Sequence, residues 1–139
     1  MPHDDLRVKK GQATKNLLLV ALGGAIGSAA RYLVGAFVGN YFGPDFPWGT
    51  FIVNVSGSFI IGVVLSFVGG GLLSAGARPF IAVGVLRGYT TFSTYTHETL
   101  QLIQDDELGA AAFNTLGQVV AGLIAVYLGV VLGWALGGT

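Results

Sequence analysis

The chain contains no cysteine and few charged residues. Of its 139 residues, 10% are charged, and the formal net charge is zero. The absence of cysteine excludes disulfides, thiolate metal sites and thiol nucleophiles. Two histidines, His3 and His97, are too few for a histidine-based metal cluster. A chain with no net charge gives no sign of the basic surface that binds nucleic acid, so we expect no nucleic-acid partner.

Apolar residues are abundant instead. Hydrophobic residues make up 53% of the chain, and its 23 glycines lie among them rather than in a linker or collagen pattern. Four apolar segments are long enough to cross a membrane. They run from about 17 to 42, 48 to 73, 79 to 103 and 108 to 136. We therefore expect an all-α membrane protein, with a four-helix transmembrane domain over residues 17–139.

The first sixteen residues are polar. We expect residues 1–16 to form a separate cytoplasmic segment that is disordered or lies on the membrane surface. They do not form a signal peptide, because the apolar run that follows is longer than a signal core and lacks a clear cleavage site.

Basic residues indicate the orientation. Lysine and arginine stay on the cytoplasmic side of a membrane, and the connections around Asp45 and Asp105 contain neither. With four crossings, all basic residues outside the apolar segments share the other side. These are Arg7, Lys9, Lys10, Lys15 and Arg78. We expect a multi-pass protein of the cell membrane with both termini in the cytoplasm.

The third apolar segment contains a polar stretch, GYTTFSTY, at residues 88–95. Its Thr, Ser and Gly residues compete with helical hydrogen bonds or loosen the backbone. Non-helical backbone inside a membrane persists only where protein buries it or where it lines a watery cavity or an ion site. Two interpretations stay open. The helix breaks here, which indicates ion or solute handling, or it continues and its hydroxyls bond to carbonyls one turn earlier.

The second segment carries Thr50, Asn54 and Ser58 at i, i+4 and i+8, on one helix face. They form either a ladder of hydrogen-bond donors along a pore or polar contacts between helices, the commonest role of such residues in membranes.

Three ionisable residues lie within apolar segments and are candidates for function. Arg31 can snorkel or bind backbone carbonyls, and Arg87 precedes the polar stretch. Glu98 is expected to snorkel to the interface or to act as a structural ion-pair partner. No catalytic set accompanies these residues, so we do not expect an enzyme.

Three motifs in this order and spacing resemble the Fluc family of fluoride channels, also called CrcB. They are GGAIG at 23–27 with ARY at 30–32, FPWGT at 46–50 with Asn54 and GSF at 57–59, and GYTTFSTY at 88–95 with Glu98 and Thr99.

The resemblance implies a passive channel that exports fluoride and so reduces its toxicity. It implies an antiparallel dimer of four-helix subunits with two pores and a structural sodium ion at the break in the third helix. The resemblance makes Asn54 the pore-lining amide, with Thr50 as its polar neighbour, and makes Phe92 and Tyr95 the aromatic pair whose ring edges contact the anion. It assigns the sodium-binding carbonyls to Thr90 and position 87, and Arg31 to the family arginine of the first helix.

The chain departs from the family pattern at several positions. Tyr95 replaces the usual Phe and Arg87 the usual Gly. On the fourth helix, Phe113 and Gly117 align with a Tyr and a Ser, so the polar track loses two hydroxyls. A rotation of this helix would bring other polar residues to the track, namely Asn114, Thr115 or Gln118.

Two alternatives to a conducting channel subunit remain. One is a poorly conducting partner subunit of a heterodimeric channel. The other is a small multidrug-type antiporter, which needs a membrane-embedded carboxylate; the first, second and fourth segments have none in their interiors.

The sequence also bears on assembly. A homodimer that inserts both ways needs balanced basic residues, whereas here all of them favour one side. Two Arg87 side chains meeting near a two-fold axis would also repel each other. We therefore expect an antiparallel dimer with a sister subunit, and the alternative is a homodimer in which Arg87 snorkels away.

Overall fold

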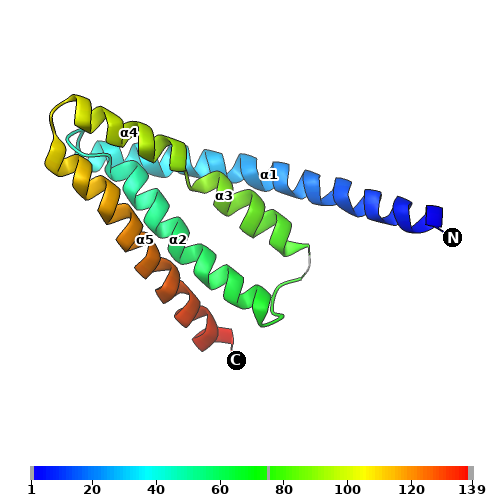
Figure 1. Ribbon diagram of the computed structural model, residues 1–139. Coiled ribbons are helices and arrows are strands. Elements are labelled where there is room, and N and C mark those ends of the chain that lie inside the picture. Colours follow the sequence, from blue (N-terminus) through cyan, green and yellow to red (C-terminus); the bar gives the residue numbers. More distant parts are fainter. Residues whose placement is uncertain (1, 75, 138–139) are drawn as a thin grey trace.

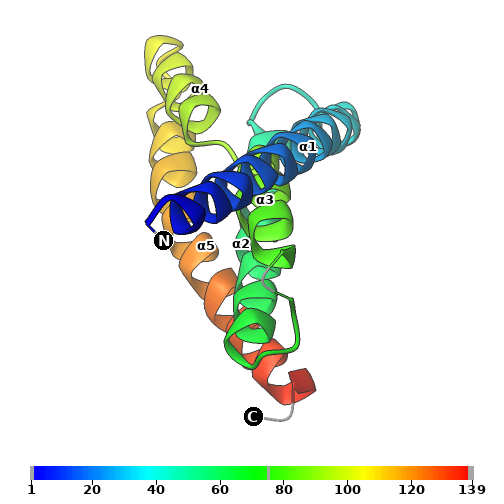
Figure 2. The same cartoon turned by 90° about the vertical axis from the view of Figure 1, so that its right-hand side faces the viewer.

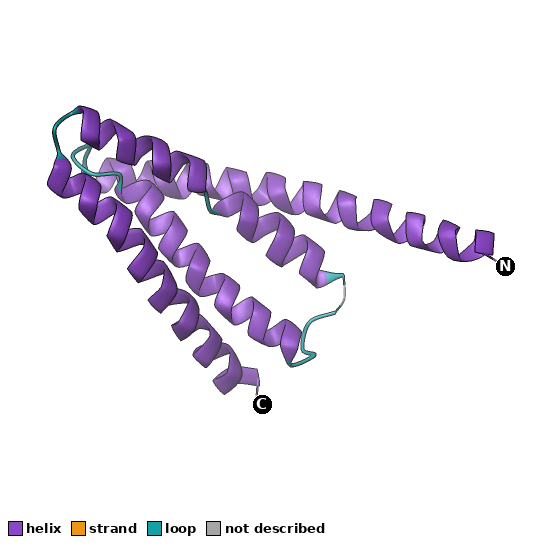
Figure 3. Cartoon of the chain, in the orientation of Figure 1, coloured by secondary structure: helices purple, strands orange, loops and turns teal. Residues whose placement is uncertain are grey.

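The structure, a computed structural model, describes residues 2–74 and 76–137 (Figure 1). Their regular elements are all helical, and no strand occurs within these ranges (Figure 3). The elements in order are α1 (Pro2–Phe42), α2 (Trp48–Gly69), a π-helical segment η1 (Arg78–Val85), α3 (Leu86–Tyr89), α4 (Phe92–Gln104) and α5 (Leu108–Gly137).

Three helices are long and apolar enough to cross a membrane. They are the part of α1 from Arg7 to Phe42, α2 and α5. The third predicted segment is also helical, but it is divided into η1, α3 and α4, so none of its pieces reaches that length. The helices end where the sequence contains turn residues. Gly43 and Gly71 adopt positive φ values of 87° and 72°, a conformation that glycine reaches without steric cost.

The first sixteen residues were expected to be disordered or to lie on the membrane surface. For residues 2–16 the disordered alternative is wrong, because they are helical, and the surface location stays a prediction. The structure continues α1 through residues 2–16, and Met1 lies outside the described residues. Extending a helix that already exists is favourable for each added residue, whereas starting a new one is costly. Local hydrogen bonds support the extension, from Gln12 to Asn16 (3.0 Å) and from the Thr14 hydroxyl to the Lys10 carbonyl (3.0 Å).

The helices pack in two groups. α2 and α5 lie side by side along much of their length, while η1 and α3 lie against α1 (Figures 1 and 2). Both contacts depend on glycine. A Cβ at Gly62 would meet the Val126 carbonyl on α5, and a Cβ at Gly27 would meet the Val85 carbonyl at the end of η1. Such close backbone approach is typical of helix contacts in lipid.

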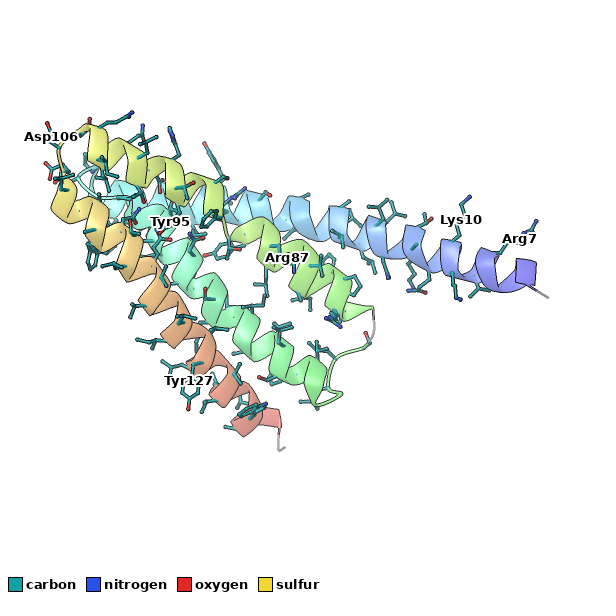
Figure 4. The ribbon with its side chains drawn as sticks, viewed as in Figure 1. Arg7, Lys10, Arg87, Tyr95, Asp106 and Tyr127 are labelled. Atoms are coloured by element: carbon teal, nitrogen blue, oxygen red, sulfur yellow. The ribbon has the colours of Figure 1, made fainter. Side chains whose placement is uncertain are left out.

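The charged residues separate toward the two ends of the molecule. Arg7 and Lys10 lie on the projecting end of α1, whereas Asp106 lies at the opposite end, in the turn between α4 and α5 (Figure 4). Arg78 begins η1, after the connection on the same side as the two termini. The helix order thus places the basic residues as the sequence analysis assumed.

Candidate functional site

The central feature of the site is an interruption between α3 and α4. α3 ends at Tyr89, and Thr90 (φ −78°, ψ 157°) and Thr91 (φ −149°, ψ 124°) are extended. α4 begins at Phe92, and the Thr91 hydroxyl accepts a hydrogen bond from the Thr94 backbone N–H at 3.3 Å. Threonine is a favoured N-cap because its side-chain oxygen satisfies such a donor. The extended pair is therefore encoded locally, by Thr91 as the cap of α4.

Asn54 on α2 supports the extended backbone from outside. The Thr91 N–H donates to Asn54 Oδ1 at 2.8 Å, and Asn54 Nδ2 donates to the Thr91 carbonyl at 3.0 Å. In a continuous helix the Thr91 N–H would instead bond to the Arg87 carbonyl. The Asn54 side chain therefore pairs with Thr91 as a neighbouring β-strand would, because it satisfies both the N–H donor and the carbonyl acceptor of this extended residue.

A chain of side-chain amides continues from Asn54. Its Nδ2 also donates to Gln118 Oε1 at 2.7 Å, Gln118 Nε2 donates to Asn114 Oδ1 at 2.8 Å, and Asn114 Nδ2 donates to Thr99 Oγ1 at 2.9 Å. The Thr99 hydroxyl donates in turn to the Tyr95 carbonyl at 2.8 Å. We call these residues the amide relay: Asn54, Gln118, Asn114 and Thr99.

The amide relay is well shielded from solvent and links three helices. Asn114 is fully buried and Gln118 is 8% exposed. Burying a polar group without a partner is costly, and here each amide has a donor on one side and an acceptor on the other. The relay therefore joins α2, α5 and α4 through satisfied hydrogen bonds.

The sequence analysis singled out Asn54 but not the roles of Asn114 and Gln118. Phe113 and Gly117, the positions aligned with the family track, lie elsewhere: the Phe113 ring stacks on Phe51 at 5.7 Å, and Gly117 also adjoins that ring. The signal that could have found the amides is their spacing, since residues four apart share a helix face. Of the residues considered for a rotated helix, Gln118 bonds to Asn54, and Asn114 bonds to Gln118.

Thr50 and Glu98 form a second polar contact. It lies one helical turn from Asn54, toward the acidic turn between α4 and α5 (Asp105, Asp106 and Glu107). The Thr50 hydroxyl donates to Glu98 Oε1 at 2.8 Å, while Glu98 Oε2 is buried and has no hydrogen-bond partner. The Glu98 carboxylate thus reaches a hydroxyl on α2, while its expected role, snorkelling to the interface or acting as an ion-pair partner, stays a prediction. A polar partner within reach competes with the interface for a side chain of this length.

Two adjoining clefts run along this side of the molecule. The larger has a volume of about 780 Å³ and includes Thr50, Glu98 and Asp105 in its lining. The smaller, of about 470 Å³, shares Thr50 with it and reaches Thr91. Asn54 is not among the lining residues of either, but its amide bonds to the Thr91 backbone at their inner end. The clefts thus lead from the end with the acidic turn to the interruption.

The two arginines have different environments. Arg31 lines the smaller cleft and its Nη1 donates to the Thr90 carbonyl at 3.4 Å, so it binds a backbone carbonyl, one of the two fates expected for it. Arg87 is exposed on α3 (Figure 4). The arrangement places one positive side chain at the interruption and another on the outer surface beside it.

The remaining predicted residues are less closely associated with Asn54. The Ser58 hydroxyl donates to the Asn54 carbonyl of its own helix at 2.8 Å. Phe92 is 76% exposed and lies 5.6 Å from the Tyr95 ring. The Tyr95 hydroxyl donates to the Thr115 carbonyl at 3.2 Å. Thr50 and Asn54 therefore engage α4 and the interruption, whereas Ser58 bonds to α2 itself.

Comparison with known proteins gives the family. The family described as "CrcB-like protein, Camphor Resistance (CrcB)" matches residues 18–130. The chain belongs to the CrcB family. Among similar proteins, "Fluoride-specific ion channel FluC" of a Thermus thermophilus strain is 51% identical over 121 residues, which cover 87% of this chain and 95% of that protein. The Nitrobacter winogradskyi protein of the same name is 46% identical over 115 residues, 82% of this chain and 91% of that protein.

Proposed function

We propose that this CrcB-family chain is a subunit of a fluoride channel that lets fluoride leave the cytoplasm passively. The names of the similar proteins support the substrate. The observation that carries the proposal is the Asn54 amide, placed at the interruption between α3 and α4 where the clefts end. Fluoride holds water tightly, so a pore must replace its water shell with N–H and O–H donors. Asn54 and Thr50 carry such groups, which bond to Thr91, Gln118 and Glu98 in this structure and would turn to the anion when it enters.

We place the anion path along Thr50, Asn54 and Phe92, with the path formed between two subunits. The Phe92 ring is exposed rather than packed against the neighbouring helices of its own chain, which leaves it free to face a second subunit. Aromatic ring edges carry partial positive charge and can contact an anion. Phe92 and Tyr95 then face the anion with their edges, and Thr50 and Glu98 line the way to the outer end.

A sodium ion fits the carbonyls at the end of α3. Because Asn54 takes the Thr91 N–H, the Arg87 carbonyl loses its helical donor. The Thr90 carbonyl accepts one long hydrogen bond, from Arg31 Nη1 at 3.4 Å, and a carbonyl oxygen has two lone pairs. The Arg87 oxygen lies at the negative end of a helix, which favours a cation, and the Thr90 oxygen follows directly after that end. The bound ion would supply positive potential that attracts anions to the site.

We further propose four crossings per subunit, both termini in the cytoplasm and an antiparallel dimer. η1, α3 and α4 together supply the fourth crossing. The separation of basic residues from Asp106 supports the orientation. Exposed Arg87 beside the interruption favours a sister subunit of opposite orientation, because two such side chains at a two-fold axis would repel each other.

Fluoride efflux from liposomes tests the function. The purified chain is reconstituted in vesicles loaded with potassium fluoride, valinomycin carries potassium, and an electrode records fluoride. We expect rapid fluoride release when the chain is paired with a related chain that has glycine at position 87, and no matching release of chloride from vesicles loaded with potassium chloride. If the chain alone releases no fluoride, the same release is measured for Arg87→Gly and for the chain co-reconstituted with a related chain that has glycine at this position. The absence of fluoride release in all three preparations contradicts a fluoride channel. Robust fluoride flux from a homodimer of the unmodified chain contradicts the proposal that a sister subunit is needed.

A further inference from the structure

The direction of every hydrogen bond in the amide relay follows from one backbone group. The Thr91 N–H can only donate, so the Asn54 oxygen must face it and the Asn54 N–H groups face Thr91 O and Gln118. Gln118 therefore presents its oxygen to Asn54 and its nitrogen to Asn114, which presents its nitrogen to Thr99. A single donor at the interruption thus orients amides on two helices.

The far end of the relay is able to reverse. The Thr99 hydroxyl accepts from Asn114 and donates to the Tyr95 carbonyl. A hydroxyl can also donate to an amide oxygen, since it carries one donor and two lone pairs. The Tyr95 carbonyl would then keep the bond from the Thr99 backbone N–H that the helix provides. Both directions of the relay therefore leave its buried groups satisfied.

We propose that Gln118 is a positioning residue that reverses its amide when an anion reaches Asn54. Without the anion, Gln118 Oε1 accepts a hydrogen bond from the Asn54 N–H that does not bond to Thr91. When an anion takes that N–H, the Gln118 amide turns and offers its own N–H to the ion, and the two side chains move apart to admit it. Asn114 turns with it, so that its nitrogen donates to the Gln118 oxygen and Thr99 donates to the Asn114 oxygen. Asn54 keeps its two bonds to Thr91 throughout.

This inference rests on the proposed function and adds a second amide donor to the fluoride site. It also explains why buried amides stand next to Asn54. A serine at position 118 would offer one short hydroxyl, whereas glutamine provides both the acceptor that holds the empty site and the donor that serves the occupied one.

Thr99 allows a matched test, because Thr96 on the same helix has a similar hydroxyl that donates to the Ser93 carbonyl but takes no part in the relay. Thr99→Val removes the group that must accept in one state and donate in the other. We expect its fluoride flux to fall by about tenfold, the effect of one lost hydrogen bond. Thr99→Ser should restore the flux, and Thr96→Val should match the unmodified chain.

Side-chain amide signals provide a readout that a purely structural role would not change. The channel, with ¹⁵N-labelled asparagine and glutamine, is titrated with sodium fluoride in lipid nanodiscs. We expect the signals of Asn54, Gln118 and Asn114 to shift together at one fluoride concentration, and those of Gln12 and Asn16, far away on α1, to stay fixed. Gln118→Met should abolish the Asn114 shift.

The outcomes separate the two proposals. Fluoride flux with a shift of Asn54 alone, or normal flux in Thr99→Val, overturns the reversal while the channel function stands. The absence of flux and amide shifts from the unmodified chain, from Arg87→Gly and from the chain co-reconstituted with a glycine-containing relative overturns both. Joint shifts of the three amides together with rescue by Thr99→Ser support the reversal.

Discussion

The α2–α5 pair and the segment from η1 to α4 differ in how they tolerate polar groups. In the pair, backbone meets backbone: a Cβ at Gly129 would meet the Phe59 carbonyl and lie 3.2 Å from the Gly62 Cα. In the segment, the backbone opens at Thr90 and Thr91, and its groups bond to side chains on α1 and α2. The first arrangement makes a closely packed scaffold, and the second replaces helical hydrogen bonds with bonds to side chains. Asn54 connects the two regions, since it belongs to α2 and bonds to the interruption.

The largest effect is expected from removing that connection. Asn54→Leu deletes both bonds to Thr91 and the bond to Gln118, and it buries no replacement donor. We expect fluoride flux to fall roughly 100-fold or more, since each lost hydrogen bond contributes about 1 kcal/mol. The measurement is efflux from liposomes, with Asn16→Leu as the matched control because Asn16 bonds only to Gln12 within α1. Normal flux in Asn54→Leu would remove Asn54 from the path.

The scaffold is tested by two glycines on α5. A methyl group at Gly129 would collide with backbone of α2, whereas at Gly109 it would meet nothing within 4 Å. We expect Gly129→Ala to destabilise the protein by ~1–3 kcal/mol through overpacking. Gly109→Ala should leave stability unchanged or raise it by about 1 kcal/mol, since alanine favours helix. Thermal unfolding in detergent measures both, and equal melting temperatures would contradict the close packing of α2 on α5.

The same two regions differ in how far the sequence predicted them. The bounds of α2 and α5 lie close to those predicted, because their long apolar runs end at turn residues. The face that α5 turns inward was not predicted. Phe113 and Gly117 are four residues apart, as are Asn114 and Gln118, so a spacing rule accepts either pair. Packing decides between the two pairs. Phe113 joins an aromatic cluster with Phe46, Trp48 and Phe51, whereas Gln118 bonds to Asn54 and Asn114 bonds to Gln118.

The polarity of the sequence also did not predict the structure of the N-terminal segment or the partner of Glu98. The polar composition of residues 1–16 predicted a separate segment that is disordered or lies on the membrane surface, yet the helix of the apolar part continues through residues 2–16. The depth of Glu98 in its segment could be read from the sequence, but its neighbour could not. Thr50 lies forty-eight positions away along the chain, and only the packing of α2 on α4 brings the two together.

An intermediate effect is expected at that contact. Thr50→Val removes the hydroxyl that donates to Glu98 Oε1, while Glu98 Oε2 already has no partner. Leaving the buried carboxylate without this donor should lower fluoride flux by about tenfold, because a hydrogen bond to a charged group contributes more than a neutral one. Thr50→Ser keeps the hydroxyl and should retain the flux. If valine and serine behave alike in the efflux measurement, the hydroxyl has no role in the path.

The smallest effect is expected at Ser58, although it shares a helix face with Thr50 and Asn54. Its hydroxyl donates to the Asn54 carbonyl of its own helix, so it is already committed to α2. Such a bond to the preceding turn contributes little to helix stability, and its loss leaves an acceptor that keeps its helical N–H partner. Ser58→Ala should therefore change fluoride flux by less than about twofold, well below the effect of losing one net hydrogen bond. A large loss of flux in Ser58→Ala would mean that the hydroxyl turns into the path when the channel conducts. The donor ladder of α2 would then extend beyond Asn54, and the scaffold and the ion path would overlap on this face of the helix.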